Sequence, residues 1–203
     1  MAATTVASSV PGKRSAGQSG RKGKQMGYSL EQFCENARDA LREDAGPVGR
    51  DKVARHLENL LVDPDFVATY LSPDQRSGAE TIYIDPEFGF HVMAHTNRGA
   101  SNNTPHCHGP SWVIYGMTMN HVEMTEWERT DDGTLDGHAD LQPREKYVLN
   151  VGQARVYNEG VIHSLNRPLE TRLIRFTGCD LDKTLRYRYN PEKQAVKVLE
   201  PVA

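Results

Sequence analysis

The sequence predicts a mainly β protein, a sandwich or barrel, that is preceded by two or three short helices. From about Thr81 onward, short apolar runs alternate with turn sequences such as DPEFG, TDDGTLDG, NVGQ and NRP. This spacing is typical of an all-β sandwich or barrel and not of βαβ units. Before residue 72 the apolar residues instead recur at helical spacing. The pattern therefore changes once along the chain, from helix to strand.

Composition excludes several classes of function. The 203 residues suffice for one substantial domain and a tail, and a formal net charge of −3 argues against a nucleic-acid binder with a basic face. No apolar run approaches the roughly 20 residues of a membrane span. The chain has three cysteines, an odd number, and no CxxC pair among Cys34, Cys107 and Cys179. We therefore expect no disulfide framework, which favours a reducing environment. We expect a cytoplasmic protein with neither nucleic-acid nor membrane partners, and composition indicates no particular oligomeric state.

The chain divides by composition into a leader and one domain. Residues 1–26 are mostly Ser, Gly, Ala, Lys and Arg, so we expect a disordered, solvated leader with almost nothing to bury. A single domain is expected over 27–203, with a helical segment at 27–72 and a β-barrel at 80–199.

Two helices are expected in the helical segment, and the sequence PDFVATYL adds a short third one. Ser29 and Gln32 fit a capping box at the start of the first helix, and Gly46 with Pro47 is expected to end it. The second helix is expected at 48–62. The apolar stripes comprise Leu30, Phe33, Cys34, Ala37 and Leu41 in the first helix, and Val53, Leu57, Leu60 and Leu61 in the second.

Eleven strands are expected after residue 80, each between turn signals. Their ranges are 81–85, 88–96, 105–108, 111–119, 121–129, 146–150, 153–157, 162–165, 170–178, 184–189 and 194–199.

Two histidines in TPHCHGPSWVIYG are the first candidates for a functional site. Side chains two apart on a strand share a face and lie about 6.6–6.8 Å apart along the chain. His106 and His108 can therefore converge on one ion, while Cys107 faces the other way. The alternative is that both are edge histidines bonded to solvent.

A second segment, GQARVYNEGVIHSLNRP, favours the metal interpretation. It consists of a glycine, five residues, a tight turn that ends in Gly160, and then His163. A turn that brings a strand back across a barrel delivers His163 to the same interior as the first pair.

At this point the chain resembles the cupin superfamily over about residues 80–199. His106 and His108 match that family's first motif, with Gly99 one residue further upstream than is typical. Gly152 to His163 match its second motif, with Asn158 where proline is usual. The resemblance implies a double-stranded β-helix, or jelly-roll, barrel. The family's glutamate ligand is absent, because Trp112 and Val113 occupy its place. The resemblance therefore implies a metal site of three histidines, His106, His108 and His163.

Within the cupins, this ligand set and the preceding helices resemble the thiol dioxygenases of the cysteine dioxygenase group. That resemblance implies Fe(II), dioxygen and a small, anionic thiol substrate. Zinc or another divalent metal remains an alternative, because three histidines and water also suit zinc.

Several features of that group are absent. Val113 replaces the cross-linked cysteine and Phe176 the tyrosine, while RLIRF replaces the Ser-His-Tyr relay. The arginine that clamps the substrate carboxylate aligns near Glu80, and an acid cannot replace it. We therefore do not expect cysteine as the substrate, and an anionic substrate needs another arginine.

Three further residues are candidates by strand alternation. His95 shares a face with His91 and Met93 and can touch substrate if that face lines the barrel. Arg172 and Arg175 lie on opposite faces of their strand, so at most one points inward. If Ile174 and Phe176 are core, Arg172 is the arginine that shares their face and can hold an anionic substrate, with a surface salt bridge as the alternative.

Tyr157 is the candidate catalytic residue, as a hydrogen-bond donor to bound oxygen, or else it is a core tyrosine. The leading hypothesis is thus an Fe(II)-dependent, thiol-dioxygenase-like cupin. The alternatives are a cupin that cleaves a carbon–carbon bond, a zinc-dependent hydrolase or lyase, and a non-catalytic cupin that binds a metal or small ligand.

Overall fold

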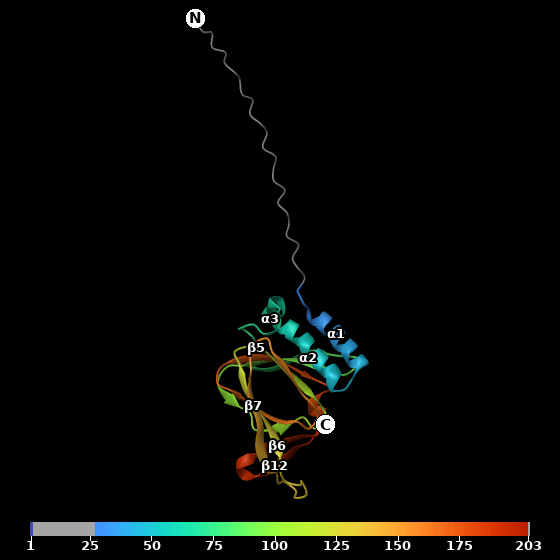
Figure 1. The fold of residues 1–203 in the computed structure, drawn as a ribbon, viewed down its shortest axis with the longest axis vertical. Helices are drawn as coiled ribbons and strands as arrows, with labels where there is room; N and C mark the ends of the chain where they lie inside the picture. Colours follow the sequence, from blue (N-terminus) through green and yellow to red (C-terminus); the bar gives the residue numbers. More distant parts are fainter. Residues whose placement is uncertain (2–26, 203) are drawn as a thin grey trace.

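The computed structural model describes Met1 and residues 27–202. The leader predicted for residues 1–26 therefore lies, Met1 excepted, outside the described residues. Three helices come first (Figure 1): α1 Leu30–Glu43, α2 Pro47–Leu61 and α3 Pro64–Tyr70. The strands that follow are β1 Gly78–Ile84, β2 His91–Asn97, β3 Ser101–Asn102, β4 His106–Cys107, β5 Val113–Met119, β6 Val122–Arg129, β7 Leu141–Leu149, β8 Ala154–Tyr157, β9 Ile162–Arg167, β10 Thr171–Thr177, β11 Arg186–Asn190 and β12 Ala195–Leu199.

Helices α1 and α3 begin where short polar side chains cap them. The Ser29 hydroxyl accepts a hydrogen bond from the Gln32 backbone N–H at 3.2 Å, and Asp63 accepts one from Phe66 N–H at 2.9 Å. Pro47 does not belong to the end of α1, which stops at Glu43, but is the first residue of α2. Proline suits that position because the first N–H groups of a helix have no intrahelical partner.

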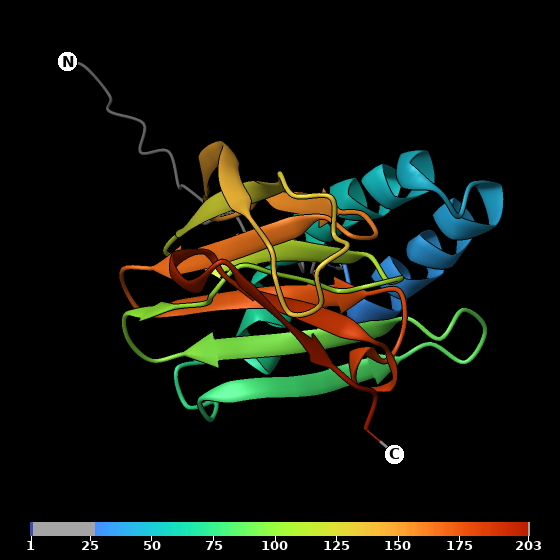
Figure 2. The same ribbon diagram turned by 90° about the horizontal axis from the view of Figure 1, so that it is seen from below.

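The strands form two antiparallel sheets. The first sheet has the order β1-β2-β10-β5-β8, and the second has the order β12-β11-β4-β9-β6-β7, with β3 paired to β9. Two sheets around a common interior form the predicted jelly-roll barrel. Figure 2 shows the β11–β12 hairpin, in red, crossing in front of the other strands. The mainly β fold class is thereby confirmed.

Two strands differ from the sequence prediction. β7 begins at Leu141 and not near residue 146. The sequence prediction missed its first half because that half is polar and contains Pro143. Proline is tolerated there since β7 is an edge strand, and the register with β6 shifts at the position where Pro143 pairs with Trp127. β3 consists of two residues and was not predicted.

The central strands β5 and β10 of the first sheet are buried on both faces. One face packs against the helices, through Ile114, Ile174 and Phe176, which share a cluster with Phe33 and Leu57. The opposite face contributes to the barrel interior. That interior is apolar at one end, where Val113, Tyr115, Met117, Val122, Met124, Leu149, Tyr157, Leu165 and Leu173 pack together.

Gly116 allows α2 to approach the first sheet. A Cβ atom at Gly116 would lie 2.7 Å from Leu61 Cδ1 and 3.0 Å from Leu57 Cδ2. Glu58 on the same helix accepts a hydrogen bond from Ala154 N–H in β8 at 3.1 Å. The helical segment is thus fixed to the sheet by both packing and a polar contact.

The three cysteines are free thiols. No helix in residues 27–202 is long and apolar enough to cross a bilayer.

Candidate metal centre

Two adjacent strands of the second sheet carry the three predicted histidines. β4 pairs with β9 so that His106 lies directly opposite His163, and His108 follows β4 by one residue. The ring centroids are 4.6 Å apart for His106 and His163, 5.1 Å for His106 and His108, and 5.2 Å for His108 and His163. The structure therefore brings together the three histidines that the sequence singled out.

The donor atoms of these histidines fit a divalent ion. One ring nitrogen from each lies within 4.8 Å of the others. The Nδ1 atoms of His106 and His163 lie 2.9 Å from Thr104 O and 3.1 Å from Val161 O. Because a carbonyl only accepts, each Nδ1 carries the proton and each Nε2 presents a lone pair. The Nε2 of His163 is buried without a hydrogen-bond partner among the described residues, as expected for a nitrogen that binds a metal.

His108 is held by a tyrosine of the neighbouring sheet. Its Nε2 lies 3.3 Å from the Tyr115 hydroxyl, while its Nδ1 is buried and has no hydrogen-bond partner in the described part of the chain. Two of the three rings therefore have an unpaired buried nitrogen. Such groups are costly to bury unless something binds them.

The rings are electrically neutral near neutral pH. Burial lowers the pKa of all three, to about 3 for His163, where the proximity of His106 lowers it further. Metal binding requires the neutral imidazole, so the fold supplies the correct protonation state before the metal arrives.

Backbone turns bring the two histidine strands together. Gly109, directly after His108, has φ 59°, and a Cβ there would collide with the carbonyl oxygen of Leu185. Its own carbonyl accepts a hydrogen bond from Gly160 N–H at 3.1 Å, in the turn that precedes His163. Only glycine adopts this conformation in this space, so the turn after His108 is fixed against the turn before His163.

The helical segment supports the same turn. Arg50 of α2, which is 8% exposed, donates to Asn158 Oδ1 at 2.8 Å and to both carboxylate oxygens of Glu159 at 2.6 and 2.7 Å. Its guanidinium lies 5.2 Å from the centroid of the Trp112 ring. Asn158, at the motif position where proline is usual, thus connects α2 to the turn that leads into His163.

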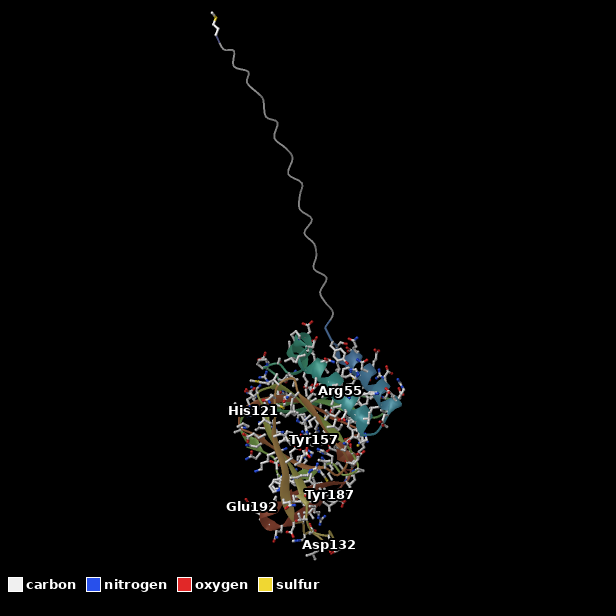
Figure 3. All side chains as sticks on the ribbon, in the orientation of Figure 1. Arg55, His121, Asp132, Tyr157, Tyr187 and Glu192 are labelled. Carbon is white, nitrogen blue, oxygen red and sulfur yellow. The ribbon has the colours of Figure 1, made fainter. Side chains whose placement is uncertain are left out.

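Tyr157 lies inside the barrel beside His163 and is labelled among the strands in Figure 3. Its ring centroid is 4.4 Å from that of His163. Its hydroxyl bonds to the Tyr147 hydroxyl at 2.6 Å, and Tyr147 donates to Glu126 Oε1 at 3.1 Å. Burial raises the pKa of Tyr157, which therefore stays protonated. Glu126, held also by Arg155 at 3.0 Å, belongs to this network and not to the histidine cluster.

Arg172 does not lie near the histidines. Ile174 and Phe176 are core, as assumed, but they pack against the helices and not inside the barrel. Arg172 shares their face and donates to the Leu71 carbonyl at 3.0 Å and to Glu170 at 2.8 Å. The structure therefore places Arg172, expected to hold substrate, on the helix-facing side of β10 and outside the histidine cluster.

Arg175 is the arginine of β10 that faces the interior. It pairs in register with Met93 of β2 and Tyr115 of β5, and its Nη2 lies 2.9 Å from Met93 Sδ. It lines a cleft of about 390 Å³, which we call the histidine cleft. The lining residues are Asn102, Asn103, Thr104, His106, Cys107, His108, Arg175, Arg186, Tyr187, Arg188 and Leu199.

His95 points to the interior on the same face of β2 as Met93. Its Nε2 is buried without a partner among residues 27–202, and its pKa is lowered to about 3 by burial and by the charges of Arg175 and Arg167. Sequence reasoning missed Arg167, which donates to Asn103 at 2.9 Å. Strand alternation places Arg167 on the face of His163 and Leu165, but the predicted strand ended at residue 165 and so did not include it.

No protein-family model and no curated protein matches the chain. Among solved structures, the chain is similar to KdgF from a Halomonas species, with 17% identity over 49% of this chain and 76% of that one, and a TM-score of 0.36. A cupin-2 domain protein from Shewanella frigidimarina has 13% identity, coverage of 55% and 89%, and a TM-score of 0.39. An oxalate oxidase in complex with glycolate, a substrate analogue, has 16% identity and a TM-score of 0.36. The match covers 52% of this chain and 53% of the oxidase, so the chain spans about half of that protein. Identities this low concern the fold and not the activity.

Replacing His163 by alanine should abolish metal retention, because two rings alone do not hold a catalytic ion. The affinity for Fe(II) or Zn(II) should fall by at least about 100-fold, while circular dichroism of the folded protein changes little. His121→Ala, between β5 and β6 and labelled in Figure 3, is the matched control and should retain metal. Full metal occupancy in His163→Ala, measured by elemental analysis after dialysis, would contradict the ligand set.

Replacing His95 by glutamine should make the metal-free protein less sensitive to acid. In the folded state the His95 pKa is about 3, against 6.5 in the unfolded chain, so the unfolded state binds the extra proton below pH 6.5. The stabilisation is complete above pH 6.5 and is lost as pH falls toward 3. Between pH 7 and pH 4 the wild type should lose roughly 2–3 kcal/mol more unfolding free energy than the variant. Urea unfolding at a series of pH values measures this, and a pH-independent difference between the two proteins would disprove it.

Proposed function

We propose that the protein is a mononuclear non-haem Fe(II) dioxygenase of the thiol-dioxygenase type, which acts on a small anionic thiol. The observation that carries this proposal is the convergence of three neutral histidines on one wall of a cleft that also contains arginine. The lining of the histidine cleft includes no aspartate or glutamate among the described residues.

The absence of an acidic ligand matters for the charge of the site. Three neutral imidazoles leave a divalent ion with its full charge of +2. A thiolate is then attracted both by that ion and by the adjacent guanidinium of Arg175. Fe(II), when bound, supplies the redox chemistry and the open positions at which dioxygen and thiolate meet.

The protein's own residues orient the reactants and control protons. Arg175 holds an anionic group of the substrate beside the histidines, because its Nε is buried and has no partner in residues 27–202. Tyr115 keeps the His108 ring in place through its hydroxyl. Tyr157 packs against His163 and, with its hydroxyl held by Tyr147, keeps water away from that side of the centre.

Iron-reconstituted protein should consume dioxygen when an anionic small thiol is added, with one O₂ taken up per thiol oxidised to sulfinate. An oxygen electrode with a panel of thiols, followed by diketones, distinguishes the thiol activity from carbon–carbon cleavage. Zinc-loaded protein is the control and should consume no oxygen. Oxygen uptake with diketones alone, or none with any compound while iron stays bound, would reject the thiol-dioxygenase proposal.

Arg175 and Arg172 offer a matched pair of arginines on opposite faces of one strand. Arg175→Ala should raise the KM for an anionic thiol by about 10- to 100-fold, as expected for a lost charge-assisted hydrogen bond. Arg172→Ala should leave KM unchanged and lower the unfolding free energy, because it removes the contacts to Leu71 and Glu170. Steady-state kinetics and urea unfolding of both variants test this, and the reverse assignment of effects would refute the role of Arg175.

A further inference from the structure

The histidine cleft holds more positive charge than the protein neutralises. Three arginines line it, Arg175, Arg186 and Arg188. Arg186 has a carboxylate partner, since it donates to Asp182 at 3.0 Å. For Arg175 and Arg188 there is no ion pair with an acidic side chain in residues 27–202. Arg175 donates to the thioether sulfur of Met93 and also interacts with the Tyr115 hydroxyl, and both of these partners are uncharged.

The two unpaired arginines lie at different depths. Arg175 is the register partner of Tyr115, whose hydroxyl contacts His108, so its guanidinium belongs to the inner part of the cleft. Arg188 pairs in register with His106 across β11 and β4 and is exposed. Register partners share a face of the sheet, which places Arg188 at the mouth of the cleft on the side of the histidines.

The buried Nε of Arg175 has no anionic partner among the described residues, which is unfavourable. The excess of positive charge around the cleft is larger than that of its lining alone. Arg167 lies behind Asn103 of the cleft, and burial lowers its pKa. A divalent ion on the neutral histidines adds two more charges. One carboxylate at Arg175 compensates only part of this charge, and it leaves the exposed Arg188, the register partner of His106, without an anion.

We infer that the substrate carries two carboxylates, one held by Arg175 beside the histidines and one held by Arg188 at the mouth. The planar fork of a guanidinium matches a carboxylate, which makes a dicarboxylate the fitting ligand. Combined with the proposed function, this inference gives a small thiol-bearing dicarboxylic acid as the substrate class. Only the thiol part of the inference rests on the proposed function. Arg188 is then the residue that distinguishes dicarboxylates from monocarboxylates.

The test compares two ligands of the same skeleton, succinate and monomethyl succinate, on the zinc-loaded protein. Neither ligand reacts, so binding is measured by isothermal titration calorimetry without turnover. Succinate should bind about 5- to 20-fold more tightly than its monomethyl ester. Arg188→Gln should reduce this ratio to about 1 and leave the affinity for the ester unchanged. Arg55→Gln, which removes the same charge from the exposed face of α2 (Figure 3), is the control and should keep the preference.

Equal affinities for the two ligands in the wild type, or a preference that persists in Arg188→Gln, would overturn the inference. Arg188 is exposed, so its replacement should not change the melting temperature, and a melting curve verifies that the variant is folded. The outcome is independent of oxygen chemistry. A dicarboxylate preference together with an absence of thiol-dependent oxygen uptake would retain the two-anion site and reject the dioxygenase proposal.

Discussion

The antiparallel pairing of β4 with β9 sets His106 directly opposite His163, and every feature of the candidate centre depends on it. β4 has only two residues and cannot define its own register. Its position is fixed from both sides, by β9 and by β11, and by the hydrogen bond from Gly160 N–H to Gly109 O between the two flanking turns. A slip by one residue would exchange His106 for Cys107 on the inner face and separate the three rings.

Burial then determines the electrostatics of the interior. The histidines lose their protons because they are buried, and the nearby Arg175 and Arg167 lower the pKa of His95 further. Neutral imidazoles beside unpaired guanidiniums leave the interior complementary to anions. Glu126, a buried acid that pairs in register with His163, is engaged by Tyr147 and Arg155 and does not offset this charge. The burial that keeps the three imidazoles neutral therefore leaves the positive charge of the histidine cleft to its arginines, and the cleft suits an anionic ligand.

Sequence alone predicted the helices, most of the strands and the meeting of the three histidines, because each depends on local periodicity or on a spaced motif. It failed where both faces of a strand are buried. In β10 the apolar residues Ile174 and Phe176 marked a core face correctly, but that core lies under the helices, so Arg175 and not Arg172 faces the cleft. Alternation separates two faces without saying which one lines the barrel. The polar first half of β7 and the two-residue β3 lacked an apolar pattern, and they are strands because a neighbouring strand pairs with them.

The helical segment is more than a cover for the first sheet. Arg50 of α2 holds both Asn158 and Glu159, five and four residues before His163, and its guanidinium lies over Trp112, four residues after His108. One side chain thus contacts the segments adjoining two of the three histidines. Since Arg50 is buried and paired, breaking its contacts with Glu159 leaves an uncompensated charge, and such losses are expensive. Docking of α2 and assembly of the histidine cluster are therefore coupled through one guanidinium. The helices stabilise the barrel by packing and orient its metal centre by this ion pair.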